Sequence, residues 1–344
     1  MEKVLVAMSG GVDSAVAALR LCEAGYDVQG VTLCLIQGKT EEAQKAAEIC
    51  ESIGIGHTVI HLEKEFEQAV QRPFIKAYQK GFTPNPCVIC NKKIKFGALM
   101  DYAVEKGFDK LATGHYASIE KQNDRYVIKK AADNSKDQTY MLWKLSQDVL
   151  SRVLFPLDNY KKTENRKKAG QYNLKNADSP DSQDICFIES GDYASFIENM
   201  TGEKSAQGNF VDTNGNILGK HNGVIRYTVG QRKGLGIALG KPRFVISKNA
   251  LENTVVLGDE QDLFYKKIYL KDTNYILIED LNEELAVTAK LRYSQFESKA
   301  VLRPCKDGAM LEFEQPQRAP APGQTAVFYI NDALVGGGII VKGE

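Results

Sequence analysis

The sequence has no net charge and no long apolar run. Its 344 residues include 44 basic and 44 acidic side chains, so no overall charge indicates a polyanionic partner, although a local basic patch could still bind one. No apolar run approaches the roughly 18 residues that a membrane span needs. The N-terminal residues MEKVLVAM lack the charged and hydrophobic regions of a signal peptide. We therefore expect a cytoplasmic protein with no membrane partner.

Cysteines are few, and their number is odd. Seven of them are spread over a chain that is too long for one ordinary core, so two or three domains are expected. This usage argues against a disulfide framework and favours thiols that pack, bind a metal or react. Cys22, Cys34 and Cys50 fall on apolar faces of predicted helices or strands, which favours core packing.

The most informative motif is a glycine turn between a strand and a helix. Residues 4–7 are an apolar run, typical of a strand that is covered on both faces. The string SGGVDS follows, and its two glycines let backbone approach a ligand closely. Asp13 or Ser14 is expected to cap the next helix, whose N-terminus would form an anion site. The glycine spacing is not that of a dinucleotide fingerprint, and a Walker lysine is absent. The string resembles the PP-loop of ATP pyrophosphatases.

Strand and helix signals alternate over the first 150 residues or so, which predicts an α/β domain with a mostly parallel sheet covered by helices on both faces. The expected strands are 4–7, 27–35, 57–62 and 110–113. The expected helices after the first one are 41–52, 65–80 and 94–106. Ligands of such sheets bind at the carboxyl ends of the strands.

The later part of the chain changes character. From about residue 208, short β-rich runs separated by turns predict one or two small β-barrels. We expect a catalytic domain at 1–155, a connector at 156–205, a small central β-rich domain at 206–262 and a C-terminal β-barrel at 263–344. The connector contains a polar stretch ending at residues 179–180 and a basic helix candidate at 161–168, which is either a solvated face or a phosphate contact.

A second motif, TPNPCVICNKKIKF at 83–96, combines two prolines, two thiols and three lysines. Because the prolines disfavour a regular helix, residues 85–90 are expected to form an extended loop. Cys87 and Cys90, at C-x-x-C spacing, are candidates for a redox pair or metal ligands. The lysines just beyond would stabilise a thiolate. Structural zinc is disfavoured, since the chain has no second C-x-x-C.

A third motif, SQDICFI at 182–188, contains a lone cysteine. Taken alone, Cys186 between Ile and Phe is more typical of a small buried hydrophobe than of a reactive thiol.

In order and spacing, these three motifs and GHYA at 114–117 resemble the tRNA-specific 2-thiouridylases, bacterial enzymes that place sulfur on C2 of the wobble uridine. Further matches continue along the chain: KDQTYML at 136–142, YTVGQRKGLGI at 227–237, LRYSQ at 291–295 and APGQTAVFY at 321–329. The resemblance therefore covers essentially the full length. It implies a PP-loop α/β domain, a central domain and a C-terminal β-barrel.

The resemblance also implies roles for particular residues. ATP, with Mg²⁺, would be bound by Ala7, Met8, Ser9, Gly10, Gly11, Val12, Asp13, Ser14, Leu33 and Gly114. The catalytic cysteine falls on Cys90 and the persulfide cysteine on Cys186. The target base would be bordered by Asn85, Pro86 and Cys87. Contacts with tRNA fall on His115, Lys136, Asp137, Gln138, Arg292, Tyr293 and Gln324. A sulfur donor protein, a cysteine desulfurase or a persulfide relay, is the other expected partner.

One departure leaves two sulfur schemes open. Many members of that family carry Asp where this chain has Cys87. In the first scheme, Cys186 carries a persulfide, and Cys90 either forms a disulfide with it or releases hydrosulfide. In the second, Cys87, Cys90 and Cys186 ligate a [4Fe–4S] cluster whose open iron binds sulfide.

Two other functions compete with tRNA thiolation. One is a PP-loop enzyme that adenylates a small molecule. The other is a non-enzymatic nucleic-acid-binding barrel protein, which leaves the PP-loop unexplained.

Overall fold

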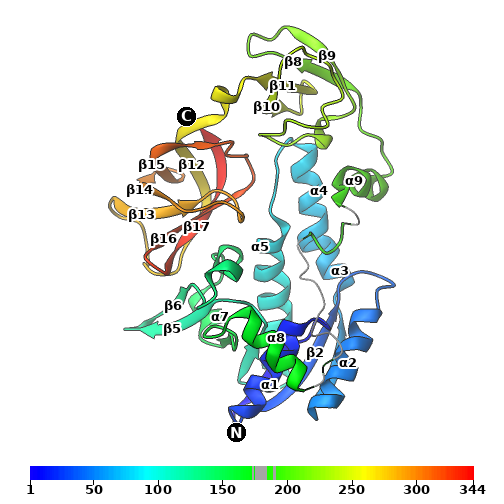
Figure 1. The fold of residues 1–344 in the computed structure, drawn as a ribbon, viewed down its shortest axis with the longest axis vertical. Helices are drawn as coiled ribbons and strands as arrows, with labels where there is room; N and C mark the ends of the chain where they lie inside the picture. The colour runs from blue at the N-terminus through cyan, green and yellow to red at the C-terminus, as the bar shows by residue number, and fades with distance from the viewer. Residues whose placement is uncertain (173, 175–183, 189–190) are drawn as a thin grey trace.

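The computed structural model describes residues 1–172, 174, 184–188 and 191–344. The polar stretch expected to end at 179–180 and residues 182–183 of the third motif lie outside the described residues. The strands of the described residues form three sheets, and Figure 1 shows the N-terminal sheet at the bottom of the view, the central domain at the top and the C-terminal barrel on the left. In the described part of the chain, no helix is long and apolar enough to cross a membrane.

The N-terminal sheet has five parallel strands in the order β3-β2-β1-β4-β7. They are β1 (Lys3–Ala7), β2 (Asp27–Cys34), β3 (Gly56–His61), β4 (Lys110–Ala112) and β7 (Val153–Leu154). Val4, Leu5 and Val6 are fully buried, as the apolar run predicts for a central strand. This confirms the expected α/β class. The order places the turn after β1 between the ends of β2 and β4.

Helices α1 (Val12–Glu23) and α2 (Glu41–Ile53) follow the first two strands. Two longer helical runs come next, each with a π-helical middle: α3, η1 and α4 (Glu63–Phe66, Glu67–Gln71, Arg72–Gln79), then α5, η2 and α6 (Pro86–Cys90, Asn91–Ala98, Leu99–Glu105). Shorter helices precede the connector: η3 (Asn134–Lys136), η4 (Thr139–Met141) and α7 (Gln147–Leu150). In the connector, α8 (Lys162–Gln171) packs against α1.

The extended loop expected over residues 85–90 is wrong, because helix α5 begins at Pro86. The side chain of Asn85 caps this helix by accepting a hydrogen bond from the Cys87 N–H at 3.1 Å. Proline is unfavourable inside a helix, but the first-turn N–H groups have no intrahelical acceptor, so Pro86 costs nothing as the first helical residue. The C-x-x-C pair therefore lies on a helix, with Cys87 in its first turn.

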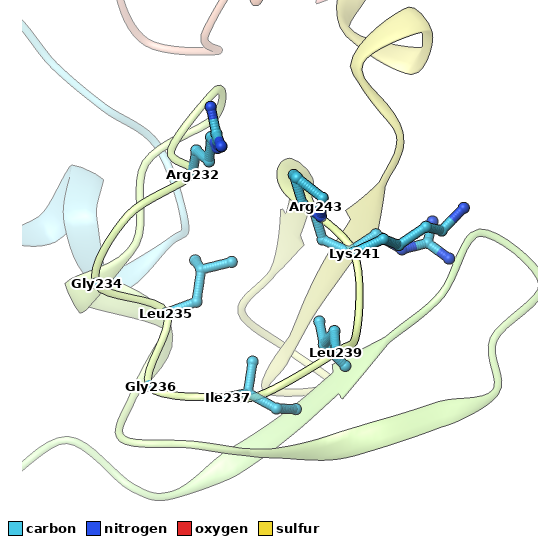
Figure 2. A pocket seen from close by; sticks show the side chains of 9 residues that line it. Arg232, Gly234, Leu235, Gly236, Ile237, Leu239, Lys241 and Arg243 are labelled. Atoms are coloured by element: carbon cyan, nitrogen blue, oxygen red, sulfur yellow. The ribbon is translucent and has the colours of Figure 1, made fainter.

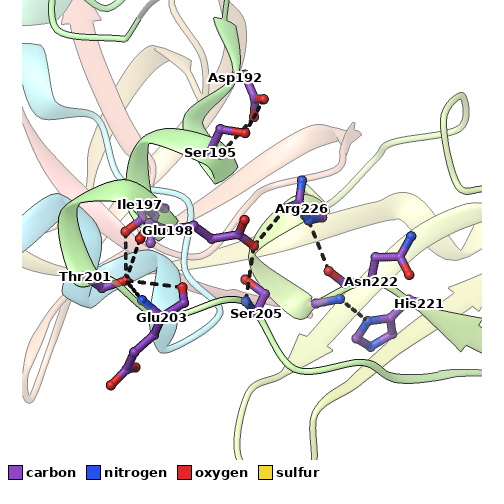
Figure 3. Close-up of polar contacts among 11 residues, drawn as sticks. Asp192, Ser195, Ile197, Glu198, Thr201, Glu203, Ser205, His221, Asn222 and Arg226 are labelled. Carbon is purple, nitrogen blue, oxygen red and sulfur yellow. Dashed lines mark hydrogen bonds and ion pairs between the residues drawn. The ribbon is translucent and has the colours of Figure 1, made fainter.

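The central domain has a mixed sheet in the order β10-β11-β8-β9. Its elements are α9 (Tyr193–Thr201), β8 (Gly208–Val211), β9 (Ile217–His221), η6 (Val224–Arg226), β10 (Phe244–Asn249), β11 (Thr254–Gly258) and η7 (Glu260–Leu263). Figure 3 shows how α9 is tied to η6: the Glu198 carboxylate accepts from the Arg226 guanidinium at 2.7 Å and from the Ser205 N–H at 3.1 Å. Arg226 is thus neutralised within the domain.

The C-terminal barrel is closed because β12 pairs with both β15 and β17. Its strands are β12 (Phe264–Tyr275), β13 (Leu285–Lys290), β14 (Ser298–Cys305), β15 (Gly308–Arg318), β16 (Thr325–Ile330) and β17 (Ala333–Gly343). The expected barrel is therefore confirmed. Sequence analysis missed the hairpin of β5 (Ser118–Gln122) and β6 (Arg125–Lys129), which extends the barrel's sheet where Lys129 pairs with Ala333. The expected domain boundaries stay predictions.

Candidate active site

The SGGVDS turn lies at the carboxyl end of β1 and opens directly into α1. The helix begins after Gly11, so the expectation that Asp13 or Ser14 caps it is wrong. Both residues fall inside the first turn, where the Ser14 hydroxyl bends back, donating to the Gly11 carbonyl at 2.9 Å and accepting from the Ser9 N–H at 3.2 Å. The N-cap residue Gly11 has no side chain that could cap α1, and helix N-termini with free N–H groups bind anions, so this end of α1 is a candidate anion site.

Gly114 and Leu33 flank this turn. A Cβ atom on Gly114 would lie 2.8 Å from the backbone carbon of Asp13 and the backbone nitrogen of Ser14, so only glycine permits this close approach. Leu33 lies near the carboxyl end of β2, beside β1. Met8 is buried, and its carbonyl accepts from the Thr32 hydroxyl at 2.9 Å. These residues surround the turn, and their contacts with ATP stay a prediction.

One buried apolar cluster contains both Cys90 and Phe187, which brings the segment of Cys186 to helix α5. Cys87 and Cys90 are the second and the last residue of α5, and Cys186 is on the described segment 184–188. A negative charge on Cys87 or on Cys186 would raise the pKa of Cys90, and a negative charge on Cys87 would also raise the pKa of Cys186. Cys90 is buried, whereas Cys186 is exposed. The expectation that Cys186, taken alone, is a small buried hydrophobe is therefore wrong.

Phe187 explains why Cys186 faces outward. Its ring is buried against the rings of Phe66, Phe74 and Phe196, with centroids 5.6, 5.4 and 5.1 Å away. The neighbouring Ile188 is also buried. These apolar anchors hold the segment on the helices and leave the thiol of Cys186 at the surface. In the ICFI string, the residues after the cysteine are therefore the buried ones.

Desolvation by the surrounding protein keeps Cys90 protonated. It raises the pKa of Cys90 to about 11 and raises the pKa of Cys87, and the protein atoms beside Cys186 raise its pKa as well, although its side chain reaches solvent. The Lys95 ammonium lowers all three pKa values, as expected for a cation near a thiolate, but burial outweighs it. In this arrangement Cys90 is a thiol at neutral pH. Its ionisation to the reactive thiolate therefore requires a change that brings solvent or a cation closer to its sulfur.

Alkylation should report this directly. With a pKa of about 11, roughly one Cys90 thiol in a thousand is ionised at pH 8, so iodoacetamide should modify it slowly, about tenfold faster per pH unit up to pH 11. Peptide mass spectrometry after timed quenching measures this, with exposed Cys305 as the internal accessibility control. A Cys90 rate that levels off below pH 9 would contradict the assignment.

The thiols as placed do not fit an iron–sulfur cluster. Among the residues that the structure describes, no three or more His, Cys, Asp or Glu side chains are arranged to hold a metal ion. A [4Fe–4S] cluster on Cys87, Cys90 and Cys186 would need three thiolates converging on it.

The candidate tRNA residues of the N-terminal half are held by internal contacts. His115 lies between the rings of Phe96 and Phe155, at 5.8 and 5.9 Å, and burial holds its pKa well below the usual range, so it is neutral. Asp137 is buried and accepts from the Thr139 hydroxyl at 2.9 Å. Gln138 accepts from the Tyr116 N–H, and Lys136 ends η3. Any role of these residues toward tRNA stays a prediction.

The three C-terminal candidates belong to the barrel, and one of them contacts the central domain. Arg292 donates to the carbonyls of Val229 and Ala319, at 3.1 and 2.9 Å, so it joins the two domains. Tyr293 is exposed, and Gln324 lies at the start of β16, where its carbonyl accepts from the Ile340 N–H. Arg292 therefore lies at the junction between the barrel and the central domain, whereas Tyr293 packs against Tyr140 of the N-terminal domain, with ring centroids 5.9 Å apart.

Sequence analysis missed the partners of Asp13. Its carboxylate accepts from the Lys162 ammonium and from the Tyr116 hydroxyl. The basic run at 161–168 indicates that a cationic helix is present. It does not indicate that Lys162 pairs with Asp13, because 149 positions separate these two residues.

A glycine turn that leads from a parallel strand into the N-terminus of α1, followed by two β-rich domains, is typical of a PP-loop type of nucleotide-binding enzyme. Family profiles agree: a tRNA methyl transferase HUP domain matches residues 2–190, a tRNA methyl transferase PRC-barrel domain 194–259 and an aminomethyltransferase beta-barrel domain 265–340. The chain is 48% identical, over 99% of both chains, to a curated protein named a tRNA-specific 2-thiouridylase, and it therefore belongs to that family.

Curated relatives carry that family name. One from Clostridium botulinum (strain Hall) is 48% identical over 354 residues, covering 99% of both chains. Another, from Acetivibrio thermocellus, is 46% identical over 355 residues, covering 98% of this chain and 99% of the relative. A solved 4-thiouridine synthetase–RNA complex with bound ATP aligns with 58% of this chain and 50% of its own, at 18% identity and a TM-score of 0.35, too low to support an argument.

Proposed function

We propose that this chain is a tRNA 2-thiouridylase. With ATP it adenylates the C2 oxygen of the wobble uridine of tRNA and replaces that oxygen with sulfur, releasing AMP and pyrophosphate. The observation that carries this function is the 48% identity with a named 2-thiouridylase across 99% of both chains. The cytoplasm, where thiols stay reduced, is the proposed location.

The ATP half of the reaction solves an electrophile problem. The C2 carbonyl of uracil is a poor electrophile, and its oxygen is a poor leaving group. Transfer of AMP to that oxygen converts it into a good leaving group, and the pyrophosphate stays on the N-terminus of α1. Mg²⁺ would enter with ATP as part of the substrate.

The sulfur half follows from the contrast between two thiols. Cys186 is exposed, which would let a donor protein load it with a persulfide. The terminal sulfur then bonds to C2 and displaces AMP. Cys90 next attacks the Cys186 sulfur, giving a Cys90–Cys186 disulfide and the 2-thiocarbonyl, or it attacks earlier and frees hydrosulfide. Either route leaves a disulfide, which an external thiol reduces.

The proposal is tested by pyrophosphate release. We expect release to require a tRNA with a wobble uridine and to be lost with a tRNA that carries another base there. Release with a small substrate and no tRNA would instead favour the small-molecule adenylating enzyme.

A basic pocket in the central domain gives a prediction about tRNA binding. It is open, with a volume of about 360 Å³, and Figure 2 shows Arg232 on one side with Lys241 and Arg243 across from it. Lys241 and Arg243 share the Asp259 carboxylate, at 3.0 and 3.3 Å. Arg232 is exposed, so its charge is available to a phosphate.

We therefore expect Arg232→Gln to weaken tRNA binding. The slope of log K against log salt is negative, and its magnitude should decrease by about one. Filter binding over a range of salt concentrations measures this. Arg226→Gln is the matched control, because Glu198 already neutralises Arg226 (Figure 3), so its slope should not change. Equal slopes for the Arg232 variant and the wild type would remove Arg232 from the tRNA surface.

A further inference from the structure

Asp13, inside the PP-loop, has a cationic partner from a distant helix. Both of its carboxylate oxygens accept from the Lys162 ammonium, at 2.7 and 2.6 Å, and one also accepts from the Tyr116 hydroxyl at 2.8 Å. The Lys162 side chain is only 8% exposed, whereas that of Asp13 is 32% exposed. The lysine is therefore the buried partner of the pair, and the carboxylate keeps part of its surface in contact with solvent.

The scaffold around this pair is itself hydrogen-bonded. The Lys162 N–H donates to the Asp133 carboxylate at 2.9 Å, which fixes the start of α8. The Asn165 amide, one turn further on, donates to the Tyr116 hydroxyl at 3.0 Å and accepts from the Arg20 guanidinium at 2.9 Å. Helix α8 is thus attached to both α1 and the segment after β4. A hydrogen-bond network of this kind restricts the movement of the Lys162 side chain.

The charge on Asp13 poses a problem for a phosphate site. It is the second residue of α1, beside the first N–H groups of the helix, and a bare carboxylate there would repel a polyphosphate. We propose that Lys162 is a positioning residue of the nucleotide site, which neutralises and orients Asp13 so that the loop accepts the phosphates of ATP. This inference rests on the proposed function for the identity of the ligand.

A matched control lies on the same helix. Lys168 of α8 pairs with Glu23 at the end of α1, at 2.6 Å, so both lysines form ion pairs between the same two helices. Only Lys162 reaches the loop end of α1. A purely structural role in holding α8 on α1 would be shared by the two pairs, whereas neutralisation of the loop belongs to Lys162 alone.

The experiment measures binding of a non-hydrolysable ATP analogue by calorimetry, in EDTA, to the full chain. Without Mg²⁺, no metal ion screens the repulsion between the Asp13 carboxylate and the phosphates of the analogue. We expect Lys162→Met to raise the Kd by about tenfold or more, and Lys162→Arg to restore most of the affinity. Lys168→Met should leave the Kd within about twofold of the wild type.

A charge rescue separates neutralisation from fold support. Asp13→Asn combined with Lys162→Met removes both charges, and we expect it to bind the analogue at least about threefold more tightly than Lys162→Met alone. It also leaves no unpaired buried charge, so it keeps the test usable if Lys162→Met does not fold. An unchanged Kd in Lys162→Met, or a double variant that binds no better than the single one, would overturn the proposal.

Two further readouts keep this inference distinct from the proposed function. In the full reaction, Lys162→Met should raise KM for ATP more than it lowers kcat, while the Kd for tRNA stays the same. Failure of the proposed function would appear in the wild type, as pyrophosphate release that does not need tRNA. The comparison of Kd values among the variants would still decide the role of Lys162.

Discussion

Replacing Cys186 with serine should abolish 2-thiouridine formation, reducing it by about a thousandfold or more, because a hydroxyl cannot carry a transferable sulfur. Pyrophosphate release that depends on tRNA should persist in this variant, since the loop at the end of β1 is untouched. Nucleoside mass spectrometry of digested tRNA measures the first quantity, and a coupled phosphate assay measures the second.

Cys305→Ser is the matched control, because Cys305 is also exposed but lies at the end of β14 in the barrel. We expect it to thiolate tRNA like the wild type. Full activity of Cys186→Ser would remove the persulfide from this residue. Loss of pyrophosphate release together with thiolation would show that the two half-reactions are not separable at this position.

Gly114→Ala should lower pyrophosphate release by about a hundredfold or more, since misplacing catalytic backbone by a fraction of an ångström to 1 Å has effects of this size. The new Cβ would lie 2.8 Å from backbone atoms of Asp13 and Ser14, and rigid backbone cannot yield as a flexible side chain would. The N-terminus of α1 would be forced away from β4. Steady-state rates at saturating ATP and tRNA measure the loss.

The control is Gly170→Ala in α8, where an added Cβ meets no atom within 4 Å. Alanine also favours the helix over glycine, so this variant should be at least as stable as the wild type. If both alanine variants released pyrophosphate at the wild-type rate, Gly114 would have no role at the loop.

Sequence reasoning succeeded where the signal was local. The buried run before the turn predicted β1, and the change to short β-rich runs predicted the barrel. It failed over residues 85–90, because prolines were treated as helix breakers, although the first turn of a helix accepts one. The first-turn position of Asp13 was also missed, since the carboxylate is bonded to Lys162 rather than to the helix backbone.

Contacts between distant segments were beyond the sequence. Nothing local connects Lys162 with Asp13, because their proximity depends on how α8 docks on α1. The outward thiol of Cys186 likewise depends on the aromatic rings that receive Phe187, which come from helices far earlier in the chain. Such contacts arise from tertiary packing, and periodicity along one segment does not contain them.

The β5–β6 hairpin means that the two ends of the chain cannot be treated as separable modules. Lys129 of β6 pairs with Ala333 of β17, and one apolar core includes both Leu5 and Leu334. A fragment cut before the barrel would leave β6 with an open edge, and unpaired edges invite aggregation. We expect expression of the catalytic half alone to fail for this reason, so the activity of this protein should belong to the full chain and not to its N-terminal domain.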